Sequence, residues 1–304
     1  MSNQAFQKEL AAKIKGTILC DEPMHLHTSW RIGGPADIFV DVAGEDDIAE
    51  VLILCKKHKV PCQVVGRGSN LLVLDKGIRG VVLHIGKGLS QNVWQTNGQV
   101  QAGAGGLLMN LVRETVQQGL GGLEWAAGIP GSVGGAVWMN AGAYGEFMGN
   151  FVTHVNVIEY TGCKRQIFLP ELDFAYRKSG LMDLAAVITS ITLKLQPRDA
   201  VLSQKKIEEL LALRQKNQPL EYPSAGSVFK NPGNDHAGRL SEAAGCKGLT
   251  VGGAQVSLKH GNFIINTGEA TAADVLALIG QVQKKVKEAF GIDLQQEIKT
   301  IGEI

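Results

Sequence analysis

The chain has 304 residues, with 30 Lys and Arg against 29 Asp and Glu, so its formal net charge is +1 at pH 7. This length suffices for two domains with substantial cores. The near balance of charge excludes a strongly basic nucleic-acid-binding protein, and no block of like charge is long enough to form a tail. The 44% hydrophobic and 19% charged residues are typical of a soluble globular protein.

The cysteines, histidines and N-terminus exclude several other classes. The five cysteines are widely spaced without a CxxC pair, which argues against a disulfide framework and a structural zinc site. The seven histidines are scattered, so we expect no metal. The N-terminus is amphipathic and lacks an apolar signal core, which indicates a cytoplasmic protein with no membrane segment.

The first part of the chain has the pattern of a small α/β unit. A short amphipathic helix precedes a strand at residues 36–42. The helix that follows begins with acidic and ends with basic residues, as the helix dipole favours. A second strand at residues 62–65 leads into the glycine-rich turn 66–70, and a helix is predicted at residues 107–120.

The later part is strand-rich from Phe151, and residues 186–196 alternate cleanly until Pro197. A helix over residues 202–216 and a Pro/Ser/Gly segment follow. Thr271 with Asp274 resembles a capping box that opens a long helix. The predicted domains are residues 1–199, with lobes of about 1–85 and 86–199, and residues 200–304.

Residues 125–145 contain no charge, yet they do not read as a membrane span. Six glycines, Pro130 and Asn140 interrupt the stretch, whereas a spanning helix satisfies its own backbone groups. Glycine permits sharp turns and close approach of another group, and successive free N–H groups bind phosphates. This loop therefore predicts a large, flat, phosphorylated ligand, with a tightly packed core turn as the alternative.

The familiar nucleotide-binding motifs are missing. Neither GxGxxG nor GxxxxGK[ST] occurs in the chain. The sequence therefore argues against a Rossmann dinucleotide site and against a P-loop. A large cofactor would instead be held by other loops. The turn 66–70, with Arg67 as a phosphate partner, and the loop 128–140 together suggest a ligand between two halves of one domain.

Three further residues carry side chains with useful chemistry. Arg177 can hold a carboxylate in bidentate fashion, or it is an ordinary surface arginine. Ser227 has no GxSxG elbow and no neighbouring histidine, which argues against a hydrolase nucleophile and leaves a capping role as the alternative. Glu297 lies beside an apolar position; burial would raise its pKa, whereas a solvent-facing position would not.

Seven motifs occur in order along nearly the whole chain. The uncharged loop lies in one of them, GLEWAAGIPGSVGGAVWMNAGAYG, and the others are HTSWRIGGPAD (27–37), VGRGSNLLV (65–73), FAYRKS (174–179), AGSVFKNP (225–232), HGNFIIN (260–266) and EIKTIG (297–302). Together they resemble the motifs of the UDP-N-acetylenolpyruvoylglucosamine reductases, the MurB family, in which the uncharged loop is the flavin-binding signature.

The resemblance implies an α+β fold. It would combine a two-lobed FAD-binding domain of the vanillyl-alcohol-oxidase (PCMH) type with a smaller C-terminal α+β substrate domain. The short connection from Arg177 to Ser227 resembles the compact subtype without an extra tyrosine-bearing loop. The implied enzyme uses FAD and NADPH to convert UDP-N-acetylglucosamine enolpyruvate into UDP-N-acetylmuramate, in peptidoglycan precursor synthesis. Separately, we expect the protein to be a monomer.

The resemblance also implies roles for individual residues. Hydride would reach C3 of the enolpyruvyl group, Ser227 would protonate C2, and Arg177 and Glu297 would hold the carboxylate. Tyr176, Arg177, Lys230 and Asn231 would bind substrate. The residues implied in FAD binding are Arg67, Gly68, Ser69, Asn70, Leu71, Gly128, Ile129, Pro130, Gly131, Ser132, Gly134 and Asn140.

The chain departs from the family at one motif. The family usually has LEPEVR where this chain has LQQEIK, at residues 294–299. Gln296 replaces a proline, so a rigid turn is lost. Lys299 replaces an arginine, which keeps the charge but loses the fork geometry of the guanidinium. We expect neither change to abolish activity. Two other readings remain open: another flavin-dependent oxidase or dehydrogenase of the same superfamily, and a non-catalytic nucleotide-sugar binding module.

Overall fold

The computed structural model describes residues 3–303 and contains two compact units, each with its own core. The predicted boundary at residue 200 separates a cofactor domain from a substrate domain. It stays a prediction, because the two compact units do not show which ligand each of them binds. Unit 1 comprises Met1–Cys20, Ile38–Arg67 and Gly80–Ala212; unit 2 comprises Asp21–Asp37, Gly68–Arg79 and Leu213–Ile304.

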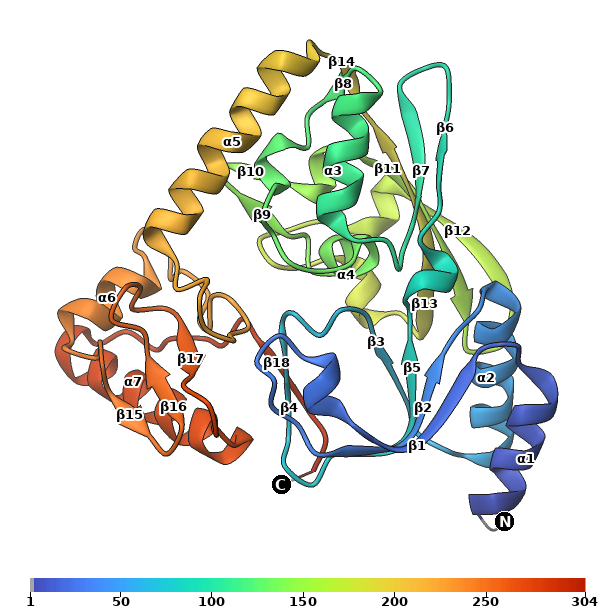
Figure 1. Cartoon of the computed structure of the whole chain (residues 1–304), viewed down its shortest axis with the longest axis horizontal. Helices are drawn as coiled ribbons and strands as arrows, with labels where there is room; N and C mark the ends of the chain where they lie inside the picture. The colour runs from blue at the N-terminus through green and yellow to red at the C-terminus, as the bar shows by residue number, and fades with distance from the viewer. Residues whose placement is uncertain (1–2, 304) are drawn as a thin grey trace. The chain divides into compact units, whose positions relative to one another are not determined.

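Two β-sheets form the framework of the first two-thirds of the chain (Figure 1). The four-stranded sheet has the order β1-β2-β5-β3, with β3 and β5 parallel. The five-stranded sheet has the order β12-β11-β13-β7-β6 and is antiparallel. Their bounds are β1 Thr17–Pro23, β2 Pro35–Asp41, β3 Cys62–Val65, β5 Ile78–His84, β6 Asn92–Trp94, β7 Gln99–Gly103, β11 Val152–Glu159, β12 Lys164–Phe168 and β13 Ala186–Lys194.

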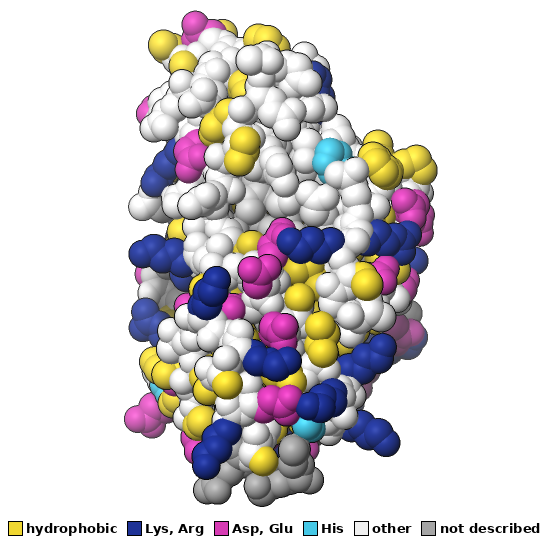
Figure 2. Space-filling model, turned by 90° about the vertical axis from the view of Figure 1, so that its right-hand side faces the viewer, with side chains coloured by type: hydrophobic (Ala, Val, Ile, Leu, Met, Phe, Trp, Pro, Cys, Tyr) yellow, Lys and Arg dark blue, Asp and Glu magenta, His cyan; other side chains and the backbone are white. Residues whose placement is uncertain are grey.

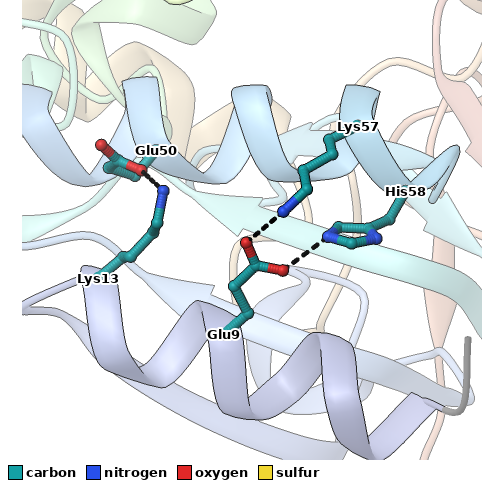
Figure 3. A network of polar contacts seen from close by, with 5 residues as sticks. All are labelled: Glu9, Lys13, Glu50, Lys57 and His58. Atoms are coloured by element: carbon teal, nitrogen blue, oxygen red, sulfur yellow. Dashed lines mark hydrogen bonds and ion pairs between the residues drawn. The ribbon is translucent and has the colours of Figure 1, made fainter.

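Helices α1 (Asn3–Lys13) and α2 (Glu45–His58) lie side by side in unit 1 (Figures 1 and 3). The Glu9 carboxylate is 2.6 Å from the Lys57 ammonium and 2.7 Å from the His58 ring, and these hydrogen bonds lower the pKa of Glu9. The acidic first turn and basic last turn of α2 confirm the predicted charge pattern.

The remaining elements of unit 1 are helices and short strands. Helix α3 ends earlier than predicted, at Gln117. Pro197 does not end all strand structure, because it pairs with Leu120. These elements are α3 Leu108–Gln117, α4 Val133–Trp138, β8 Leu120–Gly121, β9 Gly142–Ala143, β10 Glu146–Phe147 and β14 Gln196–Pro197; α5 Ala200–Asn217 begins in unit 1 and ends in unit 2.

Unit 2 packs helices against a three-stranded sheet of order β15-β16-β17, and β4 pairs in parallel with β18. The predicted capping box of the long helix is confirmed: Thr271 Oγ1 accepts the Asp274 N–H, and Asp274 accepts the Thr271 N–H. The bounds are β4 Leu71–Val73, α6 Ala237–Ala243, β15 Thr250–Val251, β16 Ala254–Val256, β17 Ile264–Asn266, α7 Ala272–Phe290 and β18 Lys299–Ile301.

Two segments from early in the sequence belong to the core of unit 2. Trp30 is fully buried, and its indole N–H donates to the Ile264 carbonyl at 2.8 Å. Asp75 accepts the N–H groups of Ala272 and Ala273 at 2.8 and 3.0 Å, so it satisfies two donors in the first turn of α7. These contacts tie residues about two hundred positions apart.

The surface and the side-chain inventory complete the description. Figure 2 shows a face on which basic and acidic side chains are interspersed. Within residues 3–303, no helix combines the length and the apolar character needed to cross a bilayer. Across the same residues, no cluster of three or more His, Cys, Asp or Glu is arranged to hold a metal ion, and the five cysteines are free thiols.

Candidate active site

The uncharged loop turns as its glycines predict. Gly128 and Gly131 have φ angles of +81° and +142°, which glycine adopts without a steric penalty. Ser132 ends the turn and begins α4, and its Oγ accepts the Gly135 N–H at 3.2 Å. The Ser132 side chain is therefore a helix cap, which is one of the ordinary roles of serine.

The expectation of free N–H groups along this loop is wrong for residues 133–135. The Val133 N–H donates to the Gly106 carbonyl at 2.9 Å, and the Gly134 N–H donates to the Ala104 carbonyl at 2.8 Å. A Cβ on Gly134 would lie 2.9 Å from the Ala104 Cβ, so glycine allows this tight packing. Here the core-turn alternative holds, because donors and acceptors meet across the fold.

The structure brings the two predicted cofactor loops into contact. Strand β3 leads directly into Gly66, where a Cβ would lie only 2.5 Å from Ser132 Oγ. Gly66, Gly128 and Gly131 stay partly exposed. These glycines expose main chain without side chains, so a phosphate group, such as those of FAD, can approach the backbone closely. The residues present therefore fit the cofactor that the sequence predicts.

Asn140 connects this loop to the turn that carries Arg177. Asn140 is buried at φ +44°, donates from Nδ2 to the Ala175 carbonyl at 2.8 Å, and accepts the Gly149 N–H at 2.9 Å. Ala175 and Lys178 form an antiparallel bridge with two backbone hydrogen bonds. Tyr176 and Arg177 therefore form a tight turn that one buried amide side chain holds against the loop.

The Arg177 side chain is held by its neighbours. Its backbone adopts φ +53°, its Nη2 donates to the Gly142 carbonyl at 3.1 Å, and its guanidinium lies over the Tyr176 ring, 5.2 Å from the ring centre. Tyr176 is exposed, whereas Arg177 is half-buried. Such a guanidinium is preoriented, which reduces the entropy lost when it binds an anion.

In unit 2, backbone pairing places Ser227 next to Glu297. Ser227 bridges to Phe263, and the Val228 carbonyl accepts the Glu297 N–H at 2.7 Å. The Lys230 N–H donates to the Gln295 carbonyl at 2.8 Å. Ser227 and Glu297 are both half-buried. Residues 70 positions apart in the sequence thus occupy adjacent backbone segments.

The segment that follows Gly68 joins the same part of unit 2. Asn70 Nδ2 donates to the Glu297 carbonyl at 3.2 Å, and Leu71 pairs with Lys299. Gly68 is at φ +60°, and a Cβ there would lie 2.0 Å from the His27 carbonyl oxygen, so glycine is required for packing. Arg67 is exposed and Ser69 is half-buried.

A cavity of about 360 Å³ in unit 2 has Ser227 and Asn231 in its wall. The side-chain oxygen of Asn231 also accepts the Ala237 N–H at 3.0 Å, at the start of α6. The other lining residues were not singled out from the sequence, although three of them lie in the motif HGNFIIN. They are His236, Gly238, Arg239, Glu242, Lys259, His260, Gly261 and Asn262.

His260 lies in this cavity wall together with charged and uncharged polar side chains. Burial, reinforced by the charge of Lys247, lowers its pKa. Its Nδ1 faces the Asn262 N–H at 3.1 Å, and its ring packs edge-on to Phe263, with ring centres 4.7 Å apart. Because Nδ1 accepts a hydrogen bond there, the neutral ring carries its own proton on Nε2.

The predicted site residues thus fall into two groups. Unit 1 holds Arg67, the loop 128–140, Tyr176 and Arg177, and Asn140 links the last two to the loop. Unit 2 holds Gly68, Ser69, Asn70 and Leu71 together with Ser227, Lys230, Asn231 and Glu297. The roles given to these residues stay predictions.

Comparison with known proteins identifies the family. The model of the UDP-N-acetylenolpyruvoylglucosamine reductase C-terminal domain matches residues 218–301, and an FAD-binding domain model matches residues 36–164. The UDP-N-acetylenolpyruvoylglucosamine reductase of Heliobacterium modesticaldum is 49% identical over 97% of this chain and 94% of its own length. The chain belongs to this reductase family. The Moorella thermoacetica reductase is 44% identical over 100% of this chain and 99% of its own length.

Solved structures agree with this membership. The reductase from Thermus caldophilus has a TM-score of 0.80 and 36% identity, covering 94% of this chain and 99% of its own. A berberine bridge enzyme variant, at 14% identity, has a TM-score of 0.50 over 63% of this chain and 43% of its own, which shows likeness of fold alone. The predicted fold class, a PCMH-type FAD-binding domain with a reductase C-terminal domain, is confirmed.

Family membership also confirms the predicted enzyme class. The chain is a flavin-dependent UDP-N-acetylmuramate dehydrogenase of peptidoglycan precursor synthesis, which uses FAD and NADPH and acts on a nucleotide sugar. The comparisons concern the whole chain and do not assign a role to any single residue.

Proposed function

We propose that Arg177, Ser227 and Glu297 carry out the reduction of the enolpyruvyl group in this enzyme. The observation that supports this most is the pairing of Ser227 with the Glu297 segment beside a polar cavity of about 360 Å³. A proton donor and a carboxyl group on adjacent backbone segments suit a reaction that builds up negative charge and then takes up a proton.

The charge distribution of the reaction defines the task of Arg177. Hydride added to C3 of the enolpyruvyl group pushes an electron pair through C2 onto the carboxylate. Preoriented donors stabilise such developing charge far better than water does. The Arg177 guanidinium, held by Gly142 and Tyr176, can give two parallel hydrogen bonds to the carboxylate.

Ser227 completes the reduction by giving its Oγ proton to C2. A free serine hydroxyl is a very weak acid, but a carbanion-like carbon is a strong enough base to take its proton. The new C–H bond uses the electron pair left at C2, and the serine recovers a proton from solvent. Glu297, in its protonated form, donates a hydrogen bond to the same substrate carboxylate.

The remaining predicted contacts concern binding. Tyr176, Lys230 and Asn231 would contact the diphosphate and sugar of the substrate. The cofactor FAD, when bound, supplies the hydride that originates from NADPH. The loops from Arg67 to Leu71 and from Gly128 to Asn140 would hold it through their main chain, as the glycine packing at Gly66 supports.

An anaerobic absorbance experiment tests these roles. NADPH is added to the FAD-loaded protein, followed by the enolpyruvyl nucleotide sugar. In the wild type the flavin absorbance should bleach on the first addition and recover on the second. In Ser227→Ala it should bleach normally, and its recovery should slow by about 10²–10⁴-fold, the usual contribution of general acid catalysis. Ser224→Ala, in the same turn, should behave as wild type.

Other results would contradict the proposal. Normal recovery in Ser227→Ala would remove Ser227 from proton delivery. A flavin whose absorbance recovers only after oxygen is admitted would contradict the reductase activity and favour an oxidase. We further propose that residues 1–199 form the FAD-binding domain, which also supplies Tyr176 and Arg177 to the substrate, and that residues 200–304 form the substrate-binding domain. We also propose that the enzyme is a cytoplasmic monomer; a dimer mass in light scattering would contradict the last point.

A further inference from the structure

The Asn262 side chain makes two hydrogen bonds to the extended segment that carries Ser227, residues 227–230. Asn262 is 4% exposed. Its Oδ1 accepts the Phe229 N–H at 2.9 Å, and its Nδ2 donates to the Phe229 carbonyl at 2.8 Å. The Asn262 carbonyl also accepts the Val228 N–H at 2.9 Å. Three hydrogen bonds from one residue thus fix the two residues after Ser227.

This contact continues a β-ladder where the backbone alone would end it. Phe263 pairs with Ser227, and the chain before it turns at His260. The Asn262 amide then takes the place of a peptide group opposite Phe229. On the other edge, Gln295 and Glu297 bond to the same strand. The segment is therefore held on both edges, and on one of them the Asn262 side chain supplies both partners of Phe229.

On the N-terminal side of Ser227, the Pro223 carbonyl accepts the Asn266 N–H at 2.9 Å and Ala225 is buried, but Gly226 separates both from Ser227. Gly226 lies at φ +76°, and a Cβ placed there would meet no atom within 4 Å. A glycine in open space does not restrict the residue that follows it. The position of Ser227 is therefore set by its bridge to Phe263 and by the residues after it, which Asn262 holds.

We propose that Asn262 is a positioning residue that aligns the Ser227 hydroxyl for proton delivery to C2; this rests on the proposed role of Ser227. Proton transfer to carbon depends steeply on alignment, and displacement by about 1 Å can cost about 100-fold in rate. Asn262 lines the same cavity as Ser227. Its effect on the reaction passes through the backbone of Val228 and Phe229.

The first test is Asn262→Ala in the two half-reactions. The change leaves the buried N–H and carbonyl of Phe229 without their partner, so the strand shifts to find others. We expect the NADPH half-reaction to stay within about twofold of wild type. Recovery of the flavin absorbance with the enolpyruvyl substrate should slow by about 10–100-fold.

The second test is Asn262→Asp, which makes the effect depend on pH. The aspartate keeps the acceptor for the Phe229 N–H but turns a carboxylate oxygen toward the Phe229 carbonyl. Burial and this repulsion favour the protonated acid, which can donate as the amide does. Recovery in this variant should therefore quicken, relative to the wild type measured at the same pH, as pH falls.

Asn266 provides a matched control in the same unit. It is also 4% exposed, donates from Nδ2 to the Trp30 carbonyl at 3.0 Å, and accepts the N–H groups of Gly268 and Ala270 at 2.8 and 3.1 Å. Its side chain does not bond to the Ser227 strand. Asn266→Ala should therefore lower stability without slowing flavin recovery more than flavin reduction.

The outcomes separate this inference from the proposed function. If reduced wild type is not reoxidised by the substrate, the proposed function fails. If wild type cycles and Ser227→Ala is blocked, but Asn262→Ala recovers normally or Asn266→Ala slows to the same extent, only the positioning role is overturned. If Asn262→Ala does not fold, the ratio of the Asn262→Asp recovery rate to the wild-type rate at each pH decides: a ratio that stays constant overturns the inference, and a ratio that rises at low pH supports it.

Discussion

Arg177 and Ser227 are held in place in different ways. Arg177 lies in a tight turn at φ +53°, and Asn140, Tyr144 and Asp173 nearby in sequence are also non-glycine residues with positive φ. Ser227 begins an extended segment, residues 227–230, that is hydrogen-bonded on both edges. The backbone at Arg177 is therefore strained, whereas the Ser227 segment is held by ordinary backbone hydrogen bonds.

Each of the two arrangements nevertheless depends on a buried asparagine of its own. Asn140 bonds to the carbonyl of Ala175 and to the N–H of Gly149, whereas Asn262 bonds to both groups of Phe229. A left-handed non-glycine residue costs about 1–2 kcal/mol, so the Arg177 turn needs its surroundings to persist. The Arg177 turn should therefore be the more sensitive of the two to loss of a single contact.

The largest effect is expected for Arg177→Ala. Loss of the guanidinium should lower turnover by about 10²–10³-fold, as removal of one preoriented donor does in other enzymes. FAD should remain bound, which the flavin spectrum after gel filtration would show. Arg177→Lys should lose less, since it keeps the charge without the fork. Loss of FAD from Arg177→Ala would instead place this residue in the cofactor site or the fold.

Asn140→Ala should give the next largest effect. It removes partners from two backbone groups and puts alanine at φ +44°, so the free energy of unfolding should fall by about 2–4 kcal/mol. Denaturant titration measures this change. Asn140→Gly removes the same bonds but tolerates the backbone, and it should be less damaging. Equal losses would show that strain contributes nothing at this position.

Glu124 makes the stability of unit 1 depend on pH. Burial raises its pKa, but hydrogen bonds from Ser203, its own backbone and Gly122, with the charge of Arg198, outweigh this and lower it. The ionised form is thus favoured on folding, so stability is present above about pH 4.5 and is lost as pH falls through the lowered value. Glu124→Gln should flatten that acid limb by about 1–2 kcal/mol, whereas Glu171→Gln, on the surface, should not.

His260 should give the smallest effect, in unit 2. Because burial lowers its pKa, folding favours the neutral ring, and the unfolded chain binds the proton more readily. Stability is therefore complete above about pH 6.5 and decreases as pH falls below it. Thermal unfolding between pH 7.5 and 5.5 should show this decrease, and His260→Gln should reduce it by up to about 1 kcal/mol. The exposed His25→Gln serves as control; an equal change there would contradict the assignment.

The sequence predicted the local features of this fold better than the distant contacts. The capping box at Thr271 and the charge pattern of α2 depend on neighbouring residues, and both were predictable. The N–H groups of Val133 and Gly134 were expected to be free, but their acceptors lie about thirty residues earlier in the chain. A glycine-rich pattern does not show where such acceptors will be.

The same limit applies to the candidate site. Ser227 and Glu297 could be identified from their motifs, but the pairing of their segments is a property of the fold. Asn262 lies in a motif that was recognised, and its role was not apparent because its partner, Phe229, is 33 residues away. Side chains that bond to backbone far away in the sequence carry little sequence signal of their own.

The early segments of unit 2 have a consequence for biosynthesis. Trp30 and Asp75 meet their partners at Ile264 and Ala272, and Leu71 pairs with Lys299 near the end of the chain. A growing polypeptide must therefore carry these segments unpaired until the ribosome has nearly finished. Contacts of such long sequence separation form slowly and leave apolar surface exposed meanwhile. We expect chaperones to bind the nascent chain here, and even short C-terminal truncations to prevent unit 2 from folding.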